Sequence, residues 1–282
     1  MIIFKKTVDL QAYLRSSKIK TDRMGFVPTM GALHEGHLSL IRESRQANTL
    51  TVSCIFINPT QFNDPKDFEK YPVTLDKDIY ELERAGTDIL FLPSVAEIYP
   101  DGTMLTTHYD LGFLETVLEG QYRPGHFQGV CTVVHRLLEI VHPSDLYLGQ
   151  KDYQQCMVLQ LLIQQLALPV RLHVCPTVRE PDGLAMSSRN LRLSQTARPK
   201  AVGIYRTLQM IQDHFQQTGP RDLVREASML LLNEGFQKVD YVEICDAASL
   251  EFAQTIDAKK SYIAMVAAFM DEVRLIDNLI LH

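Results

Sequence analysis

The sequence lacks the features that mark membrane, secreted and nucleic-acid-binding proteins. No apolar run approaches the roughly 20 residues that a helix needs to span a bilayer, and the apolar start of the chain is too short and too soon charged for a signal peptide. Lys and Arg number 28 against 34 Asp and Glu, a net charge of −6, whereas nucleic-acid binding needs a basic surface that displaces counterions. We therefore expect a cytoplasmic protein with neither a membrane nor a nucleic acid as partner.

Cysteine is scarce as well. The five cysteines are scattered, mostly among apolar residues, and form neither a Cys-x-x-Cys pair nor the even set of a disulfide framework. This pattern predicts small buried thiols in a reducing compartment. Internal repeats and low-complexity segments are also missing.

What the sequence does contain is an alternation of short apolar runs and helical patterns up to Pro176. Its 282 residues, 46% of them apolar, suffice for one large domain and a smaller one. Continuous apolar runs bounded by Pro, Gly or Asn are typical of strands covered on both faces, as in parallel sheets. We expect such strands at Met24–Pro28, Leu50–Asn58, Thr87–Pro93, Asp145–Gly149 and Val170–Pro176.

Helical patterns separate these strands. Gly86 provides a stop for one helix, and another segment carries a clear apolar stripe at 3–4 spacing. We expect helices at Gly36–Ala47, Leu75–Ala85, Phe127–Val141 and Lys151–Leu168. Strands that alternate with helices predict an α/β fold with a parallel, doubly wound sheet.

The pattern changes after Thr177. Two helical segments, Ser194–Gln217 and Arg221–Gly235, are separated by the breaker Thr218-Gly219-Pro220. Runs typical of antiparallel strands follow at Val239–Cys245, Tyr262–Phe269 and Val273–Leu281. We expect a larger domain over residues 1–177 and a smaller α+β domain over residues 178–282.

The most informative segment runs from Pro28-Thr29-Met30-Gly31 to His34 and His37. It passes from a strand through a glycine turn into a helix, whose N-terminus favours phosphate. Two imidazoles three residues apart face the same way and can donate to phosphate oxygens. Such donors stabilise the charge that develops during adenylyl transfer. Two other interpretations remain open: a metal site, although further ligands are lacking, and ordinary residues at a helix start.

Two further segments suit phosphate binding. After the turn Asp182-Gly183, the hydroxyls of Ser187 and Ser188 and the cation of Arg189 are able to clamp phosphates in a loop. An ordinary polar loop is the alternative. Gly149, Lys151 and Asp152 lie where a strand ends and a helix begins, and ligands bind at such strand ends in open parallel sheets. There Lys151 can neutralise phosphate and Asp152 can accept from a ribose hydroxyl, unless the segment is only a polar helix start.

The fourth segment contains Gln61, just after the second expected strand. Gln61 and Gln155 are uncharged donors of the kind that orient a hydroxy acid. Buried or turn-forming amides are the alternative for both residues.

Taken together, these segments resemble the pantoate–β-alanine ligases (pantothenate synthetases), which are nucleotidyltransferases with a His-x-Gly-His motif. The resemblance runs from Val27 to Asn278. It rests on four motifs that occur in order: Pro28–His37, Arg123–Val130, Lys151–Gln155 and Asp182–Asn190.

The resemblance implies a Rossmann-like N-terminal domain with an α+β C-terminal lid, a homodimer, and Mg²⁺ bound with ATP. In the implied reaction, pantoate and ATP form pantoyl adenylate and pyrophosphate. The amine of β-alanine then displaces AMP to give pantothenate.

The resemblance also implies roles for individual residues. His37 and His34 would stabilise the reacting phosphate, and Gln61 and Gln155 would bind pantoate. Asp78 would help to place Mg²⁺. Lys151, Ser187, Ser188 and Arg189 would hold the triphosphate, and Pro28, Met30, Gly149, Asp152, Val178 and Met186 would complete the ATP site.

Four positions depart from the usual pattern of the family. They are Thr60 in place of Met, Gln150 in place of Glu, Val73 in place of Arg, and Lys77 in place of an acidic residue. These changes bear on the metal and pantoate sites, not on the class of reaction. An adenylyltransferase for nicotinate mononucleotide or phosphopantetheine, and a non-catalytic metal-binding protein, remain the alternative functions.

Overall fold

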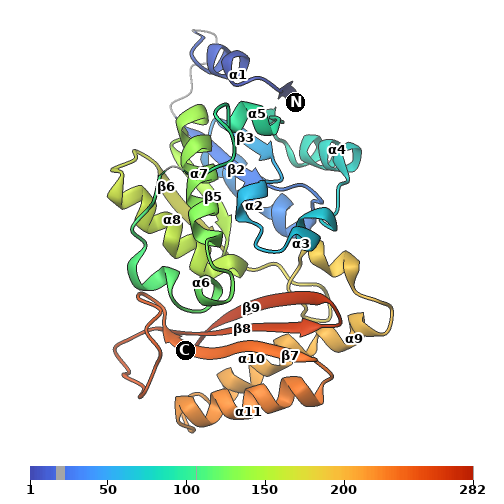
Figure 1. The fold of residues 1–282 in the computed structure, drawn as a ribbon, viewed down its shortest axis with the longest axis vertical. Coiled ribbons are helices and arrows are strands. Elements are labelled where there is room, and N and C mark those ends of the chain that lie inside the picture. Colours follow the sequence, from blue (N-terminus) through green and yellow to red (C-terminus); the bar gives the residue numbers. More distant parts are fainter. Residues whose placement is uncertain (17–22, 106, 282) are drawn as a thin grey trace. The chain divides into compact units, whose positions relative to one another are not determined.

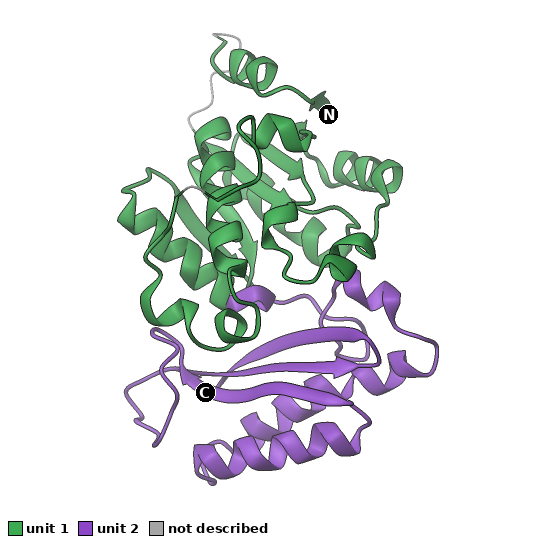
Figure 2. Cartoon of the chain, in the orientation of Figure 1, with its two compact units in different colours: residues 1–150, 154–176 green, residues 151–153, 177–282 purple. Residues whose placement is uncertain are grey.

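The structure is a computed structural model that describes residues 1–16, 23–105 and 107–281, with its elements labelled in Figure 1. The chain forms two compact units, coloured separately in Figure 2. The first unit comprises Met1–Gln150 and Gln154–Pro176, and the second comprises Lys151–Tyr153 and Thr177–His282. Lys151–Tyr153 therefore interrupt the sequence of the first unit and belong to the second unit.

The first unit is built on a six-stranded sheet in the order β1-β4-β3-β2-β5-β6. Every pairing in it is parallel, which confirms the predicted α/β fold. The strands are β1 (Ile2–Phe4), β2 (Met24–Thr29), β3 (Leu50–Ile55), β4 (Ile89–Phe91), β5 (Asp145–Gly149) and β6 (Arg171–Cys175). The order reverses between β2 and β5, and in open sheets this switch point is where ligands bind.

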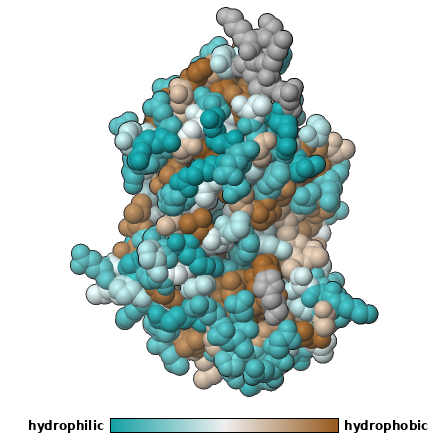
Figure 3. All heavy atoms as spheres, turned by 180° about the vertical axis from the view of Figure 1, so that it is seen from behind, coloured by the Kyte–Doolittle hydropathy of each residue, from teal (hydrophilic) through white to brown (hydrophobic). Residues whose placement is uncertain are grey.

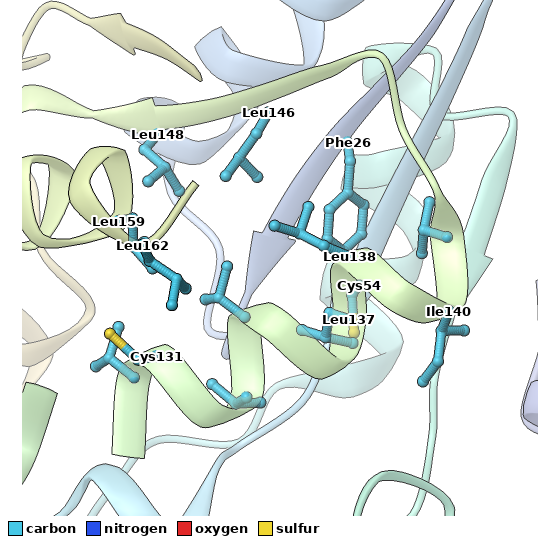
Figure 4. Close-up of a cluster of buried hydrophobic side chains, with 14 of the residues drawn as sticks. Phe26, Cys54, Cys131, Leu137, Leu138, Ile140, Leu146, Leu148, Leu159 and Leu162 are labelled. Carbon is cyan, nitrogen blue, oxygen red and sulfur yellow. The ribbon is translucent and has the colours of Figure 1, made fainter. Parts of the chain in front are cut away.

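Helices cover both faces of this sheet. Phe26 shares one core cluster with side chains of α7 (His126–Val141) and α8 (Tyr153–Gln165). In Figure 4, Leu138 of α7 lies beside Phe26, and Leu159 and Leu162 of α8 lie nearer to Leu148. The next residue, Val27, points to the opposite face and packs with α2 (Glu35–Ala47) and α4 (Leu75–Ala85). Burial on both faces explains the continuous apolar runs in the strands.

Shorter elements connect this framework. α1 (Thr7–Leu14) and α5 (Val95–Ile98) add Leu10 and Ile98 to the α7–α8 side of the core. The remaining elements are η1 (Pro59–Gln61), α3 (Pro65–Glu69), η2 (Gly112–Glu115), α6 (Glu119–Tyr122) and η3 (Gln150–Asp152). None of these short elements, nor β1 and α1, follows from the sequence patterns described above.

Several predicted bounds in the first unit are wrong. The strand expected at Thr87–Pro93 is only Ile89–Phe91, and the helix expected to end at Leu168 ends at Gln165. The second strand, expected to reach Asn58, ends at Ile55, and Asn58 instead caps η1 by accepting a hydrogen bond from the Thr60 N–H. The helix expected from Lys151 begins only at Tyr153, after the 3-10 turn η3. The carbonyl of Lys151 is instead bonded to the side chain of Asn278, 2.9 Å away.

The second unit is an antiparallel sheet with helices on one face. The sheet has the order β7 (Lys238–Asp246), β8 (Tyr262–Met270), β9 (Val273–Leu281). Its core joins side chains of α10 (Gly203–His214) and α11 (Pro220–Asn233) to the sheet. Figure 1 shows both helices along one face of that sheet. This arrangement confirms the predicted α+β character.

The helix expected at Ser194–Gln217 is instead two helices. α9 (Ala197–Ala201) ends before α10, and η4 (Ser188–Arg192) precedes both. Gly203 begins α10 where Glu234 and Phe236 approach so closely that a Cβ would lie 3.0 Å from the Glu234 side chain. Glycine permits this approach.

All five cysteines are buried and outside disulfides, as predicted. Burial raises the pKa of the Cys131 thiol to about 12 and that of Cys175 to about 11. In the described part of the chain, no helix is both long and apolar enough to cross a membrane. On the face shown in Figure 3, hydrophobic residues lie in small groups among hydrophilic ones.

Candidate active site

The signature loop follows β2 at the switch point of the sheet. The hydroxyl of Thr29 donates to the Cys54 carbonyl at 2.8 Å and accepts from the Gly31 N–H at 3.3 Å. Gly31 (φ +82°) and Ala32 (φ +48°) are both left-handed and turn the chain towards α2. Glycine suits this conformation, whereas alanine adopts it only when other contacts hold it.

Asp78 of α4 supplies those contacts. Its side chain is 1% exposed, and its two oxygens accept hydrogen bonds from the N–H groups of Ala32 and Leu33, both at 2.8 Å. The hydroxyl of Thr74 donates to the same carboxylate at 3.0 Å. A cavity of about 270 Å³ also adjoins Met30, Gly31 and Ala32. Because the loop is not packed on that side, its hydrogen bonds as well as its packing hold it in place. In the structure the Asp78 carboxylate accepts hydrogen bonds from the loop backbone. Its role in placing Mg²⁺ stays a prediction.

His34 and His37 are brought together at the start of α2. Their ring centroids are 4.0 Å apart, and both residues are half-buried. The backbone N–H of His34 donates to Nδ1 of His37 at 3.3 Å. An Nδ1 that accepts carries no proton, so this hydrogen bond assigns the proton of the neutral ring to Nε2. His37 therefore has a donor on its far side, as a phosphate ligand needs.

Gln61 is held in one orientation next to Met30. Its Oε1 accepts from Nδ2 of Asn58 at 3.1 Å, and its Nε2 lies 3.1 Å from the sulfur of Met30. Nδ1 of His126 is bonded to the Gln61 carbonyl at 2.8 Å. Tyr99 donates to Oδ1 of Asn58 at 2.7 Å and thereby fixes which way the Asn58 amide points.

Asn58, Tyr99 and His126 are absent from the sequence-based site. Asn58 lies beside Gln61 in the sequence and His126 lies in the Arg123–Val130 motif, so a local signal existed for both. Tyr99 had none. Thr60, which departs from the family pattern, joins the network through its hydroxyl, 3.1 Å from Oδ1 of Asn58 and 3.2 Å from the Tyr99 hydroxyl.

Gly149 and Gln155 lie on the other side of the switch point. β5 pairs with β2 in parallel, Gly25 with Asp145 and Phe26 with Leu146, so Gly149 ends its strand beside the start of the signature loop. No atom lies within 4 Å of where a Gly149 Cβ would be, so the backbone here is open to close approach. Gln155 is half-buried in the first turn of α8.

In the second unit, the predicted ATP-binding residues lie on a hairpin, at the start of η4 and on η3. Val178 and Met186 are joined by a hydrogen bond from the Met186 N–H to the Val178 carbonyl at 3.0 Å. The Ser187 hydroxyl caps η4 by accepting from the Arg189 N–H at 3.3 Å, and Ser188 is buried. On η3, the side chain of Lys151 is 16% exposed, and its ammonium lies 3.8 Å from the Asp152 carboxylate.

Comparison with known proteins identifies the family. The family model for pantoate-beta-alanine ligase matches residues 2–280. The chain belongs to this family. Pantothenate synthetases of Cytophaga hutchinsonii and Thermotoga petrophila are each 44% identical to it over 284 residues, and the alignments cover 100% of this chain and 99% and 100% of the relatives.

Solved structures give the same result. A pantothenate synthetase from Thermus thermophilus matches with a TM-score of 0.91 and 39% identity over 99% of each chain. A pantoate–β-alanine ligase from Francisella tularensis, complexed with β,γ-ATP and β-alanine, matches with a TM-score of 0.82 and 40% identity over 99% of this chain and 97% of that one. The chain is thus a ligase of pantothenate biosynthesis, which condenses pantoate with β-alanine.

Proposed function

We propose that the chain performs this condensation in two steps and that ATP activates the acid. A carboxylate oxygen of pantoate attacks the α-phosphate of ATP, which gives pantoyl adenylate and releases pyrophosphate. The amine of β-alanine then attacks the acyl carbon and AMP leaves with the bonding electrons. The observation that supports the proposal is the His34–His37 hydrogen bond, because an accepting Nδ1 leaves Nε2 of His37 as the donor of the ring at the start of α2.

His37 stabilises the negative charge that builds on the α-phosphate and the leaving pyrophosphate. This charge is larger in the transition state than in bound ATP, so a donor fixed in advance lowers the barrier. His34 acts at the same helix start and orients its neighbour. In the second unit, Lys151, Ser187, Ser188 and Arg189 supply donors for the phosphates, while Asp152, Val178 and Met186 contact the nucleoside. Pro28, Met30 and Gly149 contribute to the nucleotide site from the first unit.

Gln61 and Gln155 select pantoate. Asn58 donates to Oε1 of Gln61 and so fixes the amide, and one N–H of the Gln61 Nε2 donates to the Met30 sulfur. The second N–H of Nε2 is the donor that this proposal assigns to the acid. An oriented amide discriminates a hydroxy acid from an acid without the hydroxyl group, since the unmatched donor would be left unpaired.

Mg²⁺ enters with ATP as a co-substrate in this proposal. Within residues 1–16, 23–105 and 107–281, no cluster of three or more His, Cys, Asp or Glu side chains is arranged to hold a metal ion. Phosphate oxygens are the ligands that Mg²⁺ most often shares with a few protein groups. The cation would screen the charge of the triphosphate. We further propose that the protein is a cytoplasmic homodimer; light scattering of the purified protein tests the oligomeric state.

The test is an assay of pantothenate and AMP formation in which ATP, pantoate, β-alanine and Mg²⁺ are omitted in turn. We expect product only with all four, and exchange of pyrophosphate into ATP that requires pantoate but not β-alanine. Exchange supported by nicotinate mononucleotide or phosphopantetheine instead of pantoate would show a different adenylyltransferase. Stoichiometric zinc without ATP binding would favour a metal-binding protein.

A further inference from the structure

Two adjacent residues of β9 contact both of the segments that are assigned to phosphate in the second unit. We propose that Asp277 and Asn278 are positioning residues that set the places of Lys151 and of the loop 178–189 for ATP. The proposal rests on the proposed function, because it takes these segments to be phosphate ligands. Neither residue has a role in the sequence-based site.

Asp277 acts through Arg179. The carboxylate of Asp277 is fully buried and bound by two nitrogens of Arg179, Nη1 to Oδ2 at 2.6 Å and Nη2 to Oδ1 at 3.1 Å. Nη2 also donates to the Asn278 carbonyl and Nη1 to the Gly183 carbonyl, each at 3.2 Å. The guanidinium lies over the ring of Tyr205, 4.1 Å from its centroid. Arg179 thus donates its hydrogen bonds to groups of the protein, and its role is to hold the loop 178–189 in place.

These contacts hold the hairpin that leads into the Ser-Ser-Arg segment. Arg179 pairs with Ala185 across the hairpin, and Gly183 forms its turn with φ +97°. A Cβ on Gly183 would lie 2.3 Å from the Tyr205 ring, so the turn is pressed against that ring. Ser187 follows two residues after Ala185. The Asp277–Arg179 pair therefore fixes the position of the hairpin from which the Ser187–Arg189 segment extends.

Asn278 acts on Lys151. Its side-chain amide donates to the Lys151 carbonyl at 2.9 Å, and the hydroxyl of Tyr153 donates to the Ala247 carbonyl at 2.8 Å. These two bonds join Lys151 and Tyr153 to residues of the second unit, to which Lys151–Tyr153 belong. Burial raises the pKa of Asp277, while Arg179 and, to a smaller extent, Lys151 act in the opposite direction. The Lys151 cation is therefore electrostatically coupled to the same carboxylate that holds the hairpin.

The chain offers a matched control on the same strand. Nε of Arg274 is 2.7 Å from Oδ2 of Asp240, and the Asp240 side chain is 3% exposed. This is a second Arg–Asp pair with a buried carboxylate, and it lies three residues before Asp277 on β9. A substitution there disturbs the sheet without removing the bonds to Lys151 or to Arg179.

The experiment compares Asn278→Ala and Asn278→Asp with the control Arg274→Gln. For each protein, KM for ATP, pantoate and β-alanine, kcat and thermal unfolding are measured. Asn278→Asp has nearly the size of the original side chain but no amide donor. We expect both Asn278 variants to raise KM for ATP or to slow pyrophosphate exchange about 10- to 100-fold, the effect of misplacing a binding group by an ångström. KM for pantoate is expected to stay within about twofold, and the control to keep its KM for ATP.

The ion pair is tested by the double variant Arg179→Met/Asp277→Leu. Removing one partner alone would leave a buried charge uncompensated, whereas apolar residues of similar volume usually preserve folding. We expect the double variant to fold and to show the same selective loss with ATP.

Three outcomes decide the matter. Wild-type KM for ATP together with wild-type pyrophosphate exchange, in both the Asn278 variants and the folded double variant, would overturn the inference. An equal rise of all three KM values, matched by the control, would also overturn it, because it would show a general structural effect. If the wild-type protein made no pantothenate, the proposed function would fail first and this inference with it.

Discussion

The backbone N–H of His34 donates to Nδ1 of His37 across a distance of 3.3 Å, at the first turn of α2. This hydrogen bond links the backbone conformation at the start of α2 to the tautomer of the His37 imidazole. A proton on Nε2 then faces away from the helix backbone. Because His34 and His37 are three residues apart, the backbone of His34 can orient the His37 ring so that its Nε2 is the donor.

Replacing His37 tests that donor. We expect His37→Ala to lower kcat for pyrophosphate exchange by about 10²-fold or more, the scale seen when one transition-state donor is removed. His37→Gln can place an amide donor near the position of Nε2 and should keep more activity than His37→Asn, whose amide lies nearer to Nδ1. Near-wild-type exchange in His37→Ala, measured with radiolabelled pyrophosphate, would remove His37 from the mechanism.

Replacing Asp78 separates a structural role from a magnesium role. In Asp78→Asn one of the two backbone N–H groups of Ala32 and Leu33 loses its acceptor, and a buried unsatisfied donor costs about 1–3 kcal/mol. We expect a lower melting temperature and a lower kcat, with an unchanged concentration of Mg²⁺ for half-maximal activity. The control is Asp76→Asn, at an exposed position of the same helix.

The opposite result for Asp78 would be equally clear. A large increase in the Mg²⁺ requirement at unchanged thermal stability would show that Asp78 serves the metal and that its bonds to the loop are secondary.

Tyr99 is predicted to act on pantoate through Asn58 and Gln61. Tyr99→Phe removes the donor that orients Asn58, so the Gln61 amide is less well fixed. We expect KM for pantoate to rise severalfold, corresponding to about 1 kcal/mol for one hydrogen bond, while KM for ATP stays unchanged. Tyr80→Phe, at a tyrosine that is 57% exposed, is the control. Equal effects on both substrates would argue against this chain of contacts.

Asp145 makes stability depend on pH at the opposite end of β5. Burial acts to raise its pKa, but hydrogen bonds from His173 at 2.6 Å and from Arg23 at 2.8 and 3.2 Å outweigh burial and lower the pKa. A carboxyl group with a lowered pKa stabilises the fold fully above its unfolded pKa of about 3.9, and the stabilisation disappears as the pH falls through the folded value.

The measurement compares urea unfolding of the wild type and Asp145→Asn. At pH 7 we expect the variant to be less stable by about 1.5–3 kcal/mol, the range for a hydrogen bond to a charged group. The difference should shrink as the pH is lowered from 5 towards 3. A difference that is independent of pH would show that the charge of Asp145 does not contribute.

Much of the fold was predictable because it depends on local patterns. The strands β2 and β5 and the helices α4 and α7 appear within a residue of their expected bounds. Gly86 is the left-handed residue that ends α4, as its position predicted. The short element β1 was missed because three residues carry too little periodicity to be distinguished.

In the candidate site, too, some features follow from the local sequence and others only from the tertiary structure. The sequence by itself determined the alternation that makes a doubly wound sheet, the turn after β2, and the pairing of His34 with His37, since all of these depend on residues within a few positions of one another. Only the tertiary structure decided that Asp78 holds Ala32, that Tyr99 orients Asn58, and that Asn278 holds Lys151. These partners are 46, 41 and 127 positions apart, and which distant side chains meet depends on strand order and packing, which no local pattern encodes.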